Sequence, residues 1–309
     1  MTRRAWLLMA LLAGLWGASY LFIKVALEDG LAPLFIVFAR LALGAIVLVP
    51  LALRAGALRP LRGLTGPIAF MALVQVVVPF VLITYGERHI ASSLTGILVS
   101  AAPIFTALIA VRYDDEERPH GIAIAGVVMG IVGVVALFGV DLSGDGAALA
   151  GGLMVLLASV GYAVGSLYLK HRLPGVPAVG IAASTLVVGA LVLAPATLPF
   201  ALPAHAPSLA AAGSMLVLGA GGTGIAFAIY YTLIAEIGPG RASLVAYIAP
   251  GFAVLYGVSL LGEPLTAGAL LGLVLILAGS WIAAEGRLPG RARATPVAPL
   301  EPPPLREPA

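Results

Sequence analysis

This sequence has no cysteine, little charge and only four histidines. Without cysteine the chain can form no disulfide, no zinc–thiolate centre and no iron–sulfur cluster. Only 10% of its 309 residues are charged, whereas a soluble domain carries about 25%. By contrast, 61% are hydrophobic and the mean hydropathy is +1.09. A chain of this composition cannot hide its apolar surface from water, so we expect it to fold in a lipid bilayer.

Apolar stretches long enough to cross a membrane follow one another along almost the whole chain. A helix needs about 20 apolar residues to span the hydrocarbon core, and short connections with Pro, Gly or charge separate the stretches. The sequence therefore predicts an all-α polytopic membrane protein with ten transmembrane helices. We expect them near residues 5–27, 32–53, 64–86, 90–111, 120–140, 149–170, 178–197, 209–232, 242–261 and 266–284. The Pro- and Arg-rich segment 286–309 is expected to be a disordered cytoplasmic tail.

The chain also repeats itself after about 146 residues. Residue types with the same spacing recur in the two halves: Trp16 and Lys24 against Tyr162 and Lys170, Pro103 and Glu116 against Pro250 and Glu263, and Gly121, Ala125 and Gly133 against Gly268, Gly272 and Ser280. Internal duplication in an apolar chain is typical of transporters. We predict one five-helix repeat over residues 5–140 and a second over 149–285.

The distribution of lysine and arginine predicts the orientation. With the N-terminus in the cytoplasm, the inner loops receive almost all basic residues and the outer loops receive Arg88 alone. Both termini are then cytoplasmic in the cell inner membrane. Because each repeat has an odd number of spans, the second copy is inverted relative to the first. The net charge of +3 lies in short loops rather than in a patch with aromatics, so we expect no nucleic-acid partner.

Several short motifs carry a family resemblance when read in order. They are Trp16-Gly17-Ala18-Ser19-Tyr20 with Lys24, Pro33 with Phe38-Ala39-Arg40, Pro103-Ile104-Phe105-Thr106, Ala242-Ser243-Leu244, Pro250 and Leu261-Gly262-Glu263-Pro264-Leu265-Thr266. The chain resembles the EamA-like group of the drug/metabolite transporter superfamily over residues 5–285. The resemblance implies a ten-helix carrier of small metabolites, often amino acids or drug-like compounds and often an exporter. The acidic run from Asp114 to Glu117 departs from the family pattern, so the usual part of Glu116 is not carried over.

Arg40 is the charged residue that lies deepest in a predicted span. An isolated charge at this depth costs several kcal/mol, so Arg40 faces the bundle or a cavity rather than lipid. Two roles remain open, an anion-binding residue in the cavity and a structural pin held by carbonyls or hydroxyls such as that of Tyr85. Gln75, in mid-span, has the same two alternatives. Lys24 lies closer to the outer face and can extend towards it.

Aromatic residues within the spans form a second group of candidates for the substrate pathway: Trp16, Tyr20, Tyr85, Tyr162 and Tyr230. Trp16 and Tyr162 occupy the same repeat position in mid-helix. We expect them either to face each other across the pseudo-two-fold axis and hold an apolar substrate, or to be ordinary core residues. Tyr85, near a helix end, has the alternative of an interfacial anchor.

Two prolines and two glutamates are candidates for the transport cycle. Pro103 and Pro250 each remove a backbone hydrogen bond and are predicted hinges. A proton-coupled carrier usually needs a carboxylate within the membrane, and no Asp or Glu lies in the middle of a span. Glu87 and Glu263, at the outer ends, are the remaining coupling candidates.

The sequence contains no convincing motif for catalysis, nucleotide binding or metal binding. The run Gly219–Gly224 fits G-x-G-x-x-G, but no strand precedes it, and in a membrane helix it indicates close packing or a local break. The histidines have no metal-ligand spacing, so we expect no metal, no cofactor and no enzyme activity. The predicted function is export of small metabolites such as amino acids, amines or drug-like compounds by alternating access. A lipid-modifying transferase and a non-transporting membrane subunit remain alternatives. Substrate, proton coupling and the choice between monomer and dimer are left open.

Overall fold

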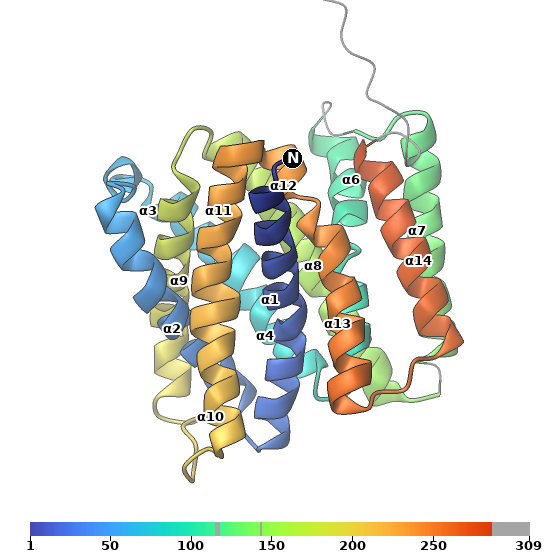
Figure 1. Ribbon diagram of the computed structural model, residues 1–309, viewed down its shortest axis with the longest axis horizontal. Helices are drawn as coiled ribbons and strands as arrows, with labels where there is room; N and C mark the ends of the chain where they lie inside the picture. Colours follow the sequence, from blue (N-terminus) through green and yellow to red (C-terminus); the bar gives the residue numbers. More distant parts are fainter. Residues whose placement is uncertain (115–117, 143, 286–309) are drawn as a thin grey trace, which may run out of the picture.

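The computed structural model describes residues 1–114, 118–142 and 144–285, and every regular element among them is a helix. Nine apolar helices of at least 18 residues are long enough to cross a membrane, and a tenth, Val245–Leu261, has 17 residues. The predicted all-α fold with ten apolar spans is confirmed (Figure 1). The predicted tail, 286–309, lies outside the described residues.

Six spans are single α-helices. Of the other four, two contain a π-helical segment, one is interrupted, and one is preceded by a short helix. The first repeat consists of α1 (Arg3–Glu28), α2 (Pro33–Arg54), η1 (Arg59–Leu61), α3 (Thr65–Met71) with η2 (Ala72–Val77) and α4 (Val78–Gly86), α5 (Ser92–Val99) with α6 (Ala102–Tyr113), and α7 (Ile122–Val140). The second consists of α8 (Gly146–Arg172), α9 (Ala178–Thr197), α10 (Leu209–Leu216) with η3 (Val217–Ile225) and α11 (Ala226–Ile237), α12 (Pro239–Ala242) with α13 (Val245–Leu261), and α14 (Ala267–Glu285).

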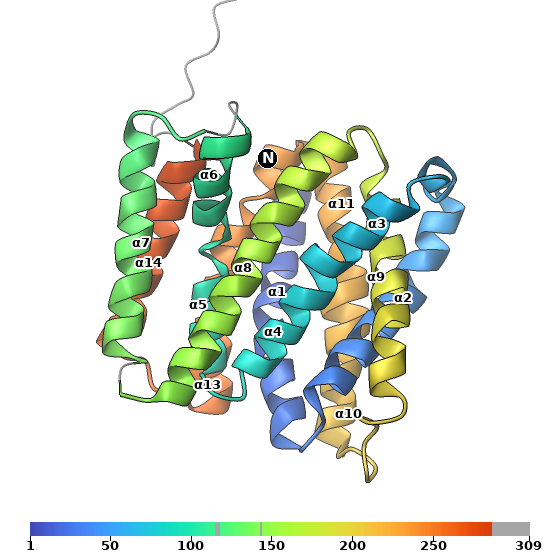
Figure 2. The ribbon, with the colours of Figure 1, turned by 180° about the vertical axis from the view of Figure 1, so that it is seen from behind.

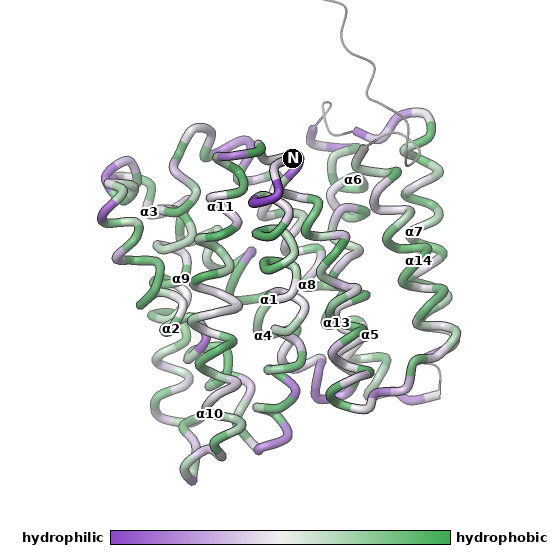
Figure 3. Tube along the Cα trace, viewed as in Figure 1, coloured by the Kyte–Doolittle hydropathy of each residue, from purple (hydrophilic) through white to green (hydrophobic). Residues whose placement is uncertain are grey.

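The two halves enter the bundle from opposite faces. The start of α1 lies on the same face as α3, α12 and the connection from α8 to α9, whereas α8 begins at the other face (Figures 1 and 2). Hydrophilic residues gather at these two faces and hydrophobic residues fill the band between them (Figure 3). This is the antiparallel arrangement that two inverted five-helix repeats require.

Helices α7 and α14, the last of each half, form a tightly packed pair at one side of the bundle (Figure 1). A Cβ atom added to Gly279 would lie 2.5 Å from the Gly130 nitrogen, and one added to Gly126 would lie 2.8 Å from the Gly279 oxygen. Only glycine permits this approach, which is how helices associate in lipid without a hydrophobic driving force. Small residues from both repeats therefore pack against each other inside one bundle.

The third span of each repeat contains a π-helical segment. η2 begins at Ala72 and η3 begins at Val217, 145 residues later, so the two segments occupy equivalent positions. A π-helix forms i to i+5 hydrogen bonds, is rare, and is frequently found at functional sites. The predicted local break at Gly219–Gly224 lies inside η3.

The fourth span breaks at Ser100 and Ala101, directly before Pro103. Hydroxyl groups from other helices donate hydrogen bonds to carbonyls at this break. Ser280 donates to the Ser100 oxygen over 3.0 Å, and Ser159 donates to the Leu98 oxygen over 3.2 Å. Broken helices are tolerated in a membrane when neighbouring side chains satisfy the backbone in this way.

Candidate functional site

Arg40 lies on α2 inside the bundle, and 8% of it is exposed. Its Nε donates a 2.8 Å hydrogen bond to Thr223 Oγ1 of η3, and its guanidinium carbon lies 3.9 Å from the centre of the Phe80 ring. Among the described residues, no carboxylate lies within ion-pair distance of Arg40. Arg40 is therefore buried between the halves and held by a hydroxyl and an aromatic face. In the described part of the chain, most of its N–H donors have no hydrogen-bond partner.

Thr223 is the partner that the sequence did not single out. Its hydroxyl accepts from Arg40 and donates to the Leu218 oxygen five residues earlier over 3.0 Å, the spacing of a π-helix. Neighbouring glycines permit close packing, because a Cβ on Gly219 would lie 2.5 Å from Leu43 and one on Gly224 would lie 2.6 Å from Val47. Thr223 lies within the run Gly219–Gly224, which is the sequence signal that could have identified it.

Two tyrosines complete the polar group around Arg40. Tyr20 of α1 and Tyr162 of α8 both interact with Arg40 electrostatically and pack in one apolar cluster. Arg40, Tyr20 and Phe80 belong to the first repeat. Tyr162 and Thr223 belong to the second. The central site, as we call these five residues, is therefore built by both halves.

Trp16 packs with aromatic residues of α11, as in the core-packing alternative. Its ring contacts Tyr230 at 5.3 Å and Phe227 at 6.1 Å between centroids, so it belongs to the aromatic group on α11. Among the described ring contacts none joins Trp16 to Tyr162, and the tyrosine that accompanies Tyr162 is Tyr20. The expected facing pair of Trp16 and Tyr162 is not seen, because the repeat-equivalent position does not have an equivalent neighbour.

Gln75 and Tyr85 are the remaining pathway candidates. Gln75 lies within η2 against α8, where a Cβ on Gly165 would meet its side-chain atoms at 2.8–3.0 Å. Tyr85 is half-buried in the last turn of α4. Arg40 bonds to Thr223 and not to Tyr85. A role of either residue in substrate contact stays a prediction.

The two predicted hinges differ. Pro103 lies in the first turn of α6, after the break in the fourth span. Pro250 lies inside α13, which is helical without interruption from Val245 to Leu261. The span that contains Pro250 is instead interrupted earlier, between α12 and α13. The structure thus provides a break for one proline and a continuous helix for the other.

The two coupling candidates also differ. The Glu263 carboxylate accepts hydrogen bonds from the backbone amides of Ser92 and Ser93, at 2.7 and 2.9 Å, and so caps the start of α5 from the other repeat. Glu87, at the end of α4, is fully buried, and both of its carboxyl oxygens are without a hydrogen-bond partner in the described part of the chain.

The repeat-related lysines end at opposite faces. Lys24 Nζ donates to the carbonyl oxygens of Glu87 and Ile90, at 3.0 and 3.4 Å. Lys170 instead forms a 3.0 Å ion pair with Asp114 at the end of α6. Glu116 lies outside the described residues.

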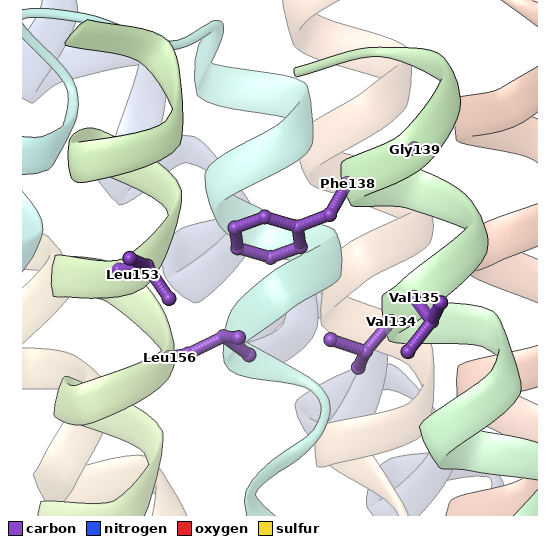
Figure 4. A pocket seen from close by; sticks show the side chains of 6 residues that line it. All are labelled: Val134, Val135, Phe138, Gly139, Leu153 and Leu156. Carbon is purple, nitrogen blue, oxygen red and sulfur yellow. The ribbon is translucent and has the colours of Figure 1, made fainter. Parts of the chain in front are cut away.

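A cavity of ≈ 430 Å³ opens between α7 and α8 (Figure 4). Its lining residues are Val134, Val135, Phe138, Gly139, Leu153 and Leu156. These side chains offer no hydrogen bond to a polar substrate. The cavity suits an apolar chain and is separate from the central site.

The bundle of ten apolar helices, with halves that enter from opposite faces and share a polar site, defines a multi-pass membrane protein of the transporter class. Residues 4–139 and 149–284 both match the model of the EamA-like transporter family. The chain belongs to this family.

Known proteins of similar sequence also bear transporter names. The transporter YoaV of Bacillus subtilis is 27% identical, over 86% of this chain and 91% of its own. The inner membrane transporter YedA of Escherichia coli K12 is 29% identical, over 82% of this chain and 81% of its own. An E. coli K12 protein named as a probable amino-acid metabolite efflux pump is 26% identical, over 91% of this chain and 95% of its own. A solved crystal structure shares the fold with a TM-score of 0.65 and 21% identity, over 92% of this chain and 99% of that one.

Proposed function

We propose that this protein exports small metabolites with a carboxylate group, amino acids in particular, across the inner membrane by alternating access, with both termini in the cytoplasm. The observation that carries the proposal is Arg40, a buried cation between the two halves with no carboxylate partner among the described residues. A charge at this depth is costly unless something pairs with it. A substrate carboxylate is the anion that fits a guanidinium with free donors. The related protein named for amino-acid metabolite efflux supports the substrate class and the direction.

The surroundings of Arg40 support binding of the rest of an amino acid. The hydroxyls of Tyr20 and Tyr162 offer acceptors and donors beside it, and Phe80 offers an apolar face. Because the site draws on both repeats, a rearrangement of one half against the other changes access to it from either face.

Purified protein in proteoliposomes tests the proposal. Vesicles loaded with labelled amino acids should release some of these compounds faster than vesicles without the protein. Vesicles with Arg40→Gln should release them no faster than the protein-free vesicles. The matched control is Arg54→Gln, at the exposed cytoplasmic end of the same helix, which should transport normally. Absence of flux for every carboxylate-bearing compound, with flux for amines alone, would contradict the proposed substrate class.

A further inference from the structure

The end of the bundle where α1 and α4 finish contains a buried acid that the central site does not use. Glu87 forms the cap of α4, its side chain is 0% exposed, and neither carboxyl oxygen has a hydrogen-bond partner in the described part of the chain. A carboxylate without partners in such a place is costly, and the group normally takes up a proton instead.

Lys24 lies beside Glu87, but its geometry is not that of an ion pair. Its ammonium donates to the backbone oxygens of Glu87 and Ile90 and so fastens α1 to the turn between α4 and α5. No bond from Lys24 to the Glu87 carboxyl is formed. The lysine therefore closes this end of the bundle while the acid beneath it stays unpaired.

Three charged groups from different elements lie within electrostatic range of the Glu87 carboxyl. Lys24 comes from α1, Arg40 from α2 and Glu263 from the connection between α13 and α14. Burial raises the pKa of the Glu87 carboxyl well above its usual range, Lys24 lowers it, Glu263 raises it and Arg40 lowers it, with burial the largest cause. Tyr20, which interacts with Arg40, also interacts with Glu87.

Other neighbours of this acid are polar groups at the rim or uncharged helix faces. A cavity of ≈ 360 Å³ beside it is lined by Lys24, Glu28, Arg88 and Glu87 among others. His89 and Arg88 follow Glu87 in the same exposed turn. α8 packs here through Gly151 and Val155, which carry no charge. The cavity thus lies directly beside the acid.

We propose that Glu87 is the proton-binding site of this carrier: it holds a proton while Lys24 fastens α1 to the turn after α4, and releases it to water when that contact opens. On release the O–H bond breaks, the proton passes to water and the electron pair stays on the Glu87 carboxylate, which water then solvates. Arg40 and Tyr20 of the central site lie within electrostatic range of Glu87. The role in coupling rests on the proposed function, whereas proton binding itself does not.

Infrared spectroscopy of the purified full-length protein tests proton binding without any substrate. At neutral pH the wild type should show the carbonyl absorption of a protonated carboxylic acid, and Glu87→Gln should lack it. Glu28→Gln is the matched control, because Glu28 lines the same cavity and is exposed. A band that persists in Glu87→Gln, or that is absent from the wild type, would overturn the proposal.

Lys24→Met provides a second variant that keeps the acid. Because Lys24 lowers the pKa of Glu87, its removal should keep the carboxylic-acid band at higher pH than in the wild type. If Lys24→Met leaves the titration of the band unchanged, Glu87 is not the acid that titrates.

The pH dependence of stability gives an independent measurement. Glu87 keeps its proton in the folded state at pH values where the unfolded chain, with a glutamate pKa of about 4.3, has lost it. The folded state then binds more protons, so stability is full below about pH 4.3 and falls as pH rises towards the raised pKa. Glu87→Gln should lack this fall, and its unfolding temperature should exceed that of the wild type at pH 8 but not at pH 4.

A transport measurement then separates the two proposals. In proteoliposomes with a labelled amino acid, a pH gradient should accelerate flux in the wild type and leave Glu87→Gln unaffected, while exchange at equal pH persists in both. If no amino acid moves but the infrared band belongs to Glu87, the substrate class is wrong and the proton site stands. If flux occurs and responds to the gradient equally in both proteins, the coupling role is wrong.

Discussion

α2 and α9 are the second helices of the two repeats and pack against each other in one apolar cluster. Their sequences match at Gly44 and Gly189 and at Pro50 and Pro195, each pair 145 residues apart. At the same spacing, Thr185 stands where the first repeat has Arg40. Thr185 is buried and donates within its own helix, to the Ala182 oxygen over 3.0 Å.

The fold is duplicated, but the buried cation Arg40 is not. The duplicated glycines, prolines and π-segments shape a bundle from two similar halves, whereas the cation comes from one half alone. Its hydrogen-bond partner, Thr223, comes from the other half. Two similar halves thus form a bundle whose polar central site is asymmetric.

The inverted arrangement of the two repeats predicts on which side of the membrane each loop lies. A reporter fused after residue 145 should be periplasmic, and one fused after residue 60 or residue 175 should be cytoplasmic, because the last two connections lie on the face where the N-terminus begins (Figure 1). Reporter activity on each side of the membrane measures this as an all-or-none result. Fusions at 60 and 175 on opposite sides would contradict the inversion.

Removing the charge should have the next largest effect. Arg40→Gln keeps length and some hydrogen bonding, and should weaken binding of a transported amino acid by roughly 1.5–3 kcal/mol, the range for a bond to a charged group. Titration calorimetry measures the loss, and the unfolding temperature controls for folding. Normal binding by a poorly inserted, thermally unstable Arg40→Gln protein would show that Arg40 is only a structural pin.

The partner from the second repeat should matter less than the charge it holds. Thr223→Val preserves shape but leaves the Arg40 Nε and the Leu218 oxygen without this hydroxyl, which costs about 1–2 kcal/mol of stability. Thr223→Ser retains the hydroxyl and is the control. Thermal unfolding compares the two, and equal unfolding temperatures would mean that the bond does not fix Arg40.

The counterpart of Arg40 should have the smallest effect. The Thr185 hydroxyl bonds to its own helix backbone, so Thr185→Val should change stability by less than about 1 kcal/mol and leave substrate binding unchanged. Calorimetry and thermal unfolding check this together. A loss of binding as large as that of Arg40→Gln would mean that both repeats supply the recognition site.

The span pattern could be predicted because membrane helices follow directly from length and hydropathy. The burial of Arg40 could be predicted from its cost in lipid. Its partners could not, since hydrogen bonding of Thr223 depends on the register of η3 against α2, which no local pattern specifies. Similarly, the sequence made Glu87 and Glu263 equal candidates for coupling. Packing distinguishes them, because Glu263 caps α5 at Ser92 and Ser93, whereas Glu87 is buried without a hydrogen-bond partner among the described residues.

Whether Arg40 binds the substrate carboxylate can be tested with a transported amino acid and its amide, which lacks the carboxylate. The affinities of both compounds are measured for the wild-type protein and for Arg40→Gln. If Arg40 binds the carboxylate, the wild type should prefer the acid by roughly 10- to 150-fold, the equivalent of 1.5–3 kcal/mol. Arg40→Gln should bind both compounds equally. A wild type that binds acid and amide alike, or an Arg40→Gln protein that keeps the full preference, would contradict the account.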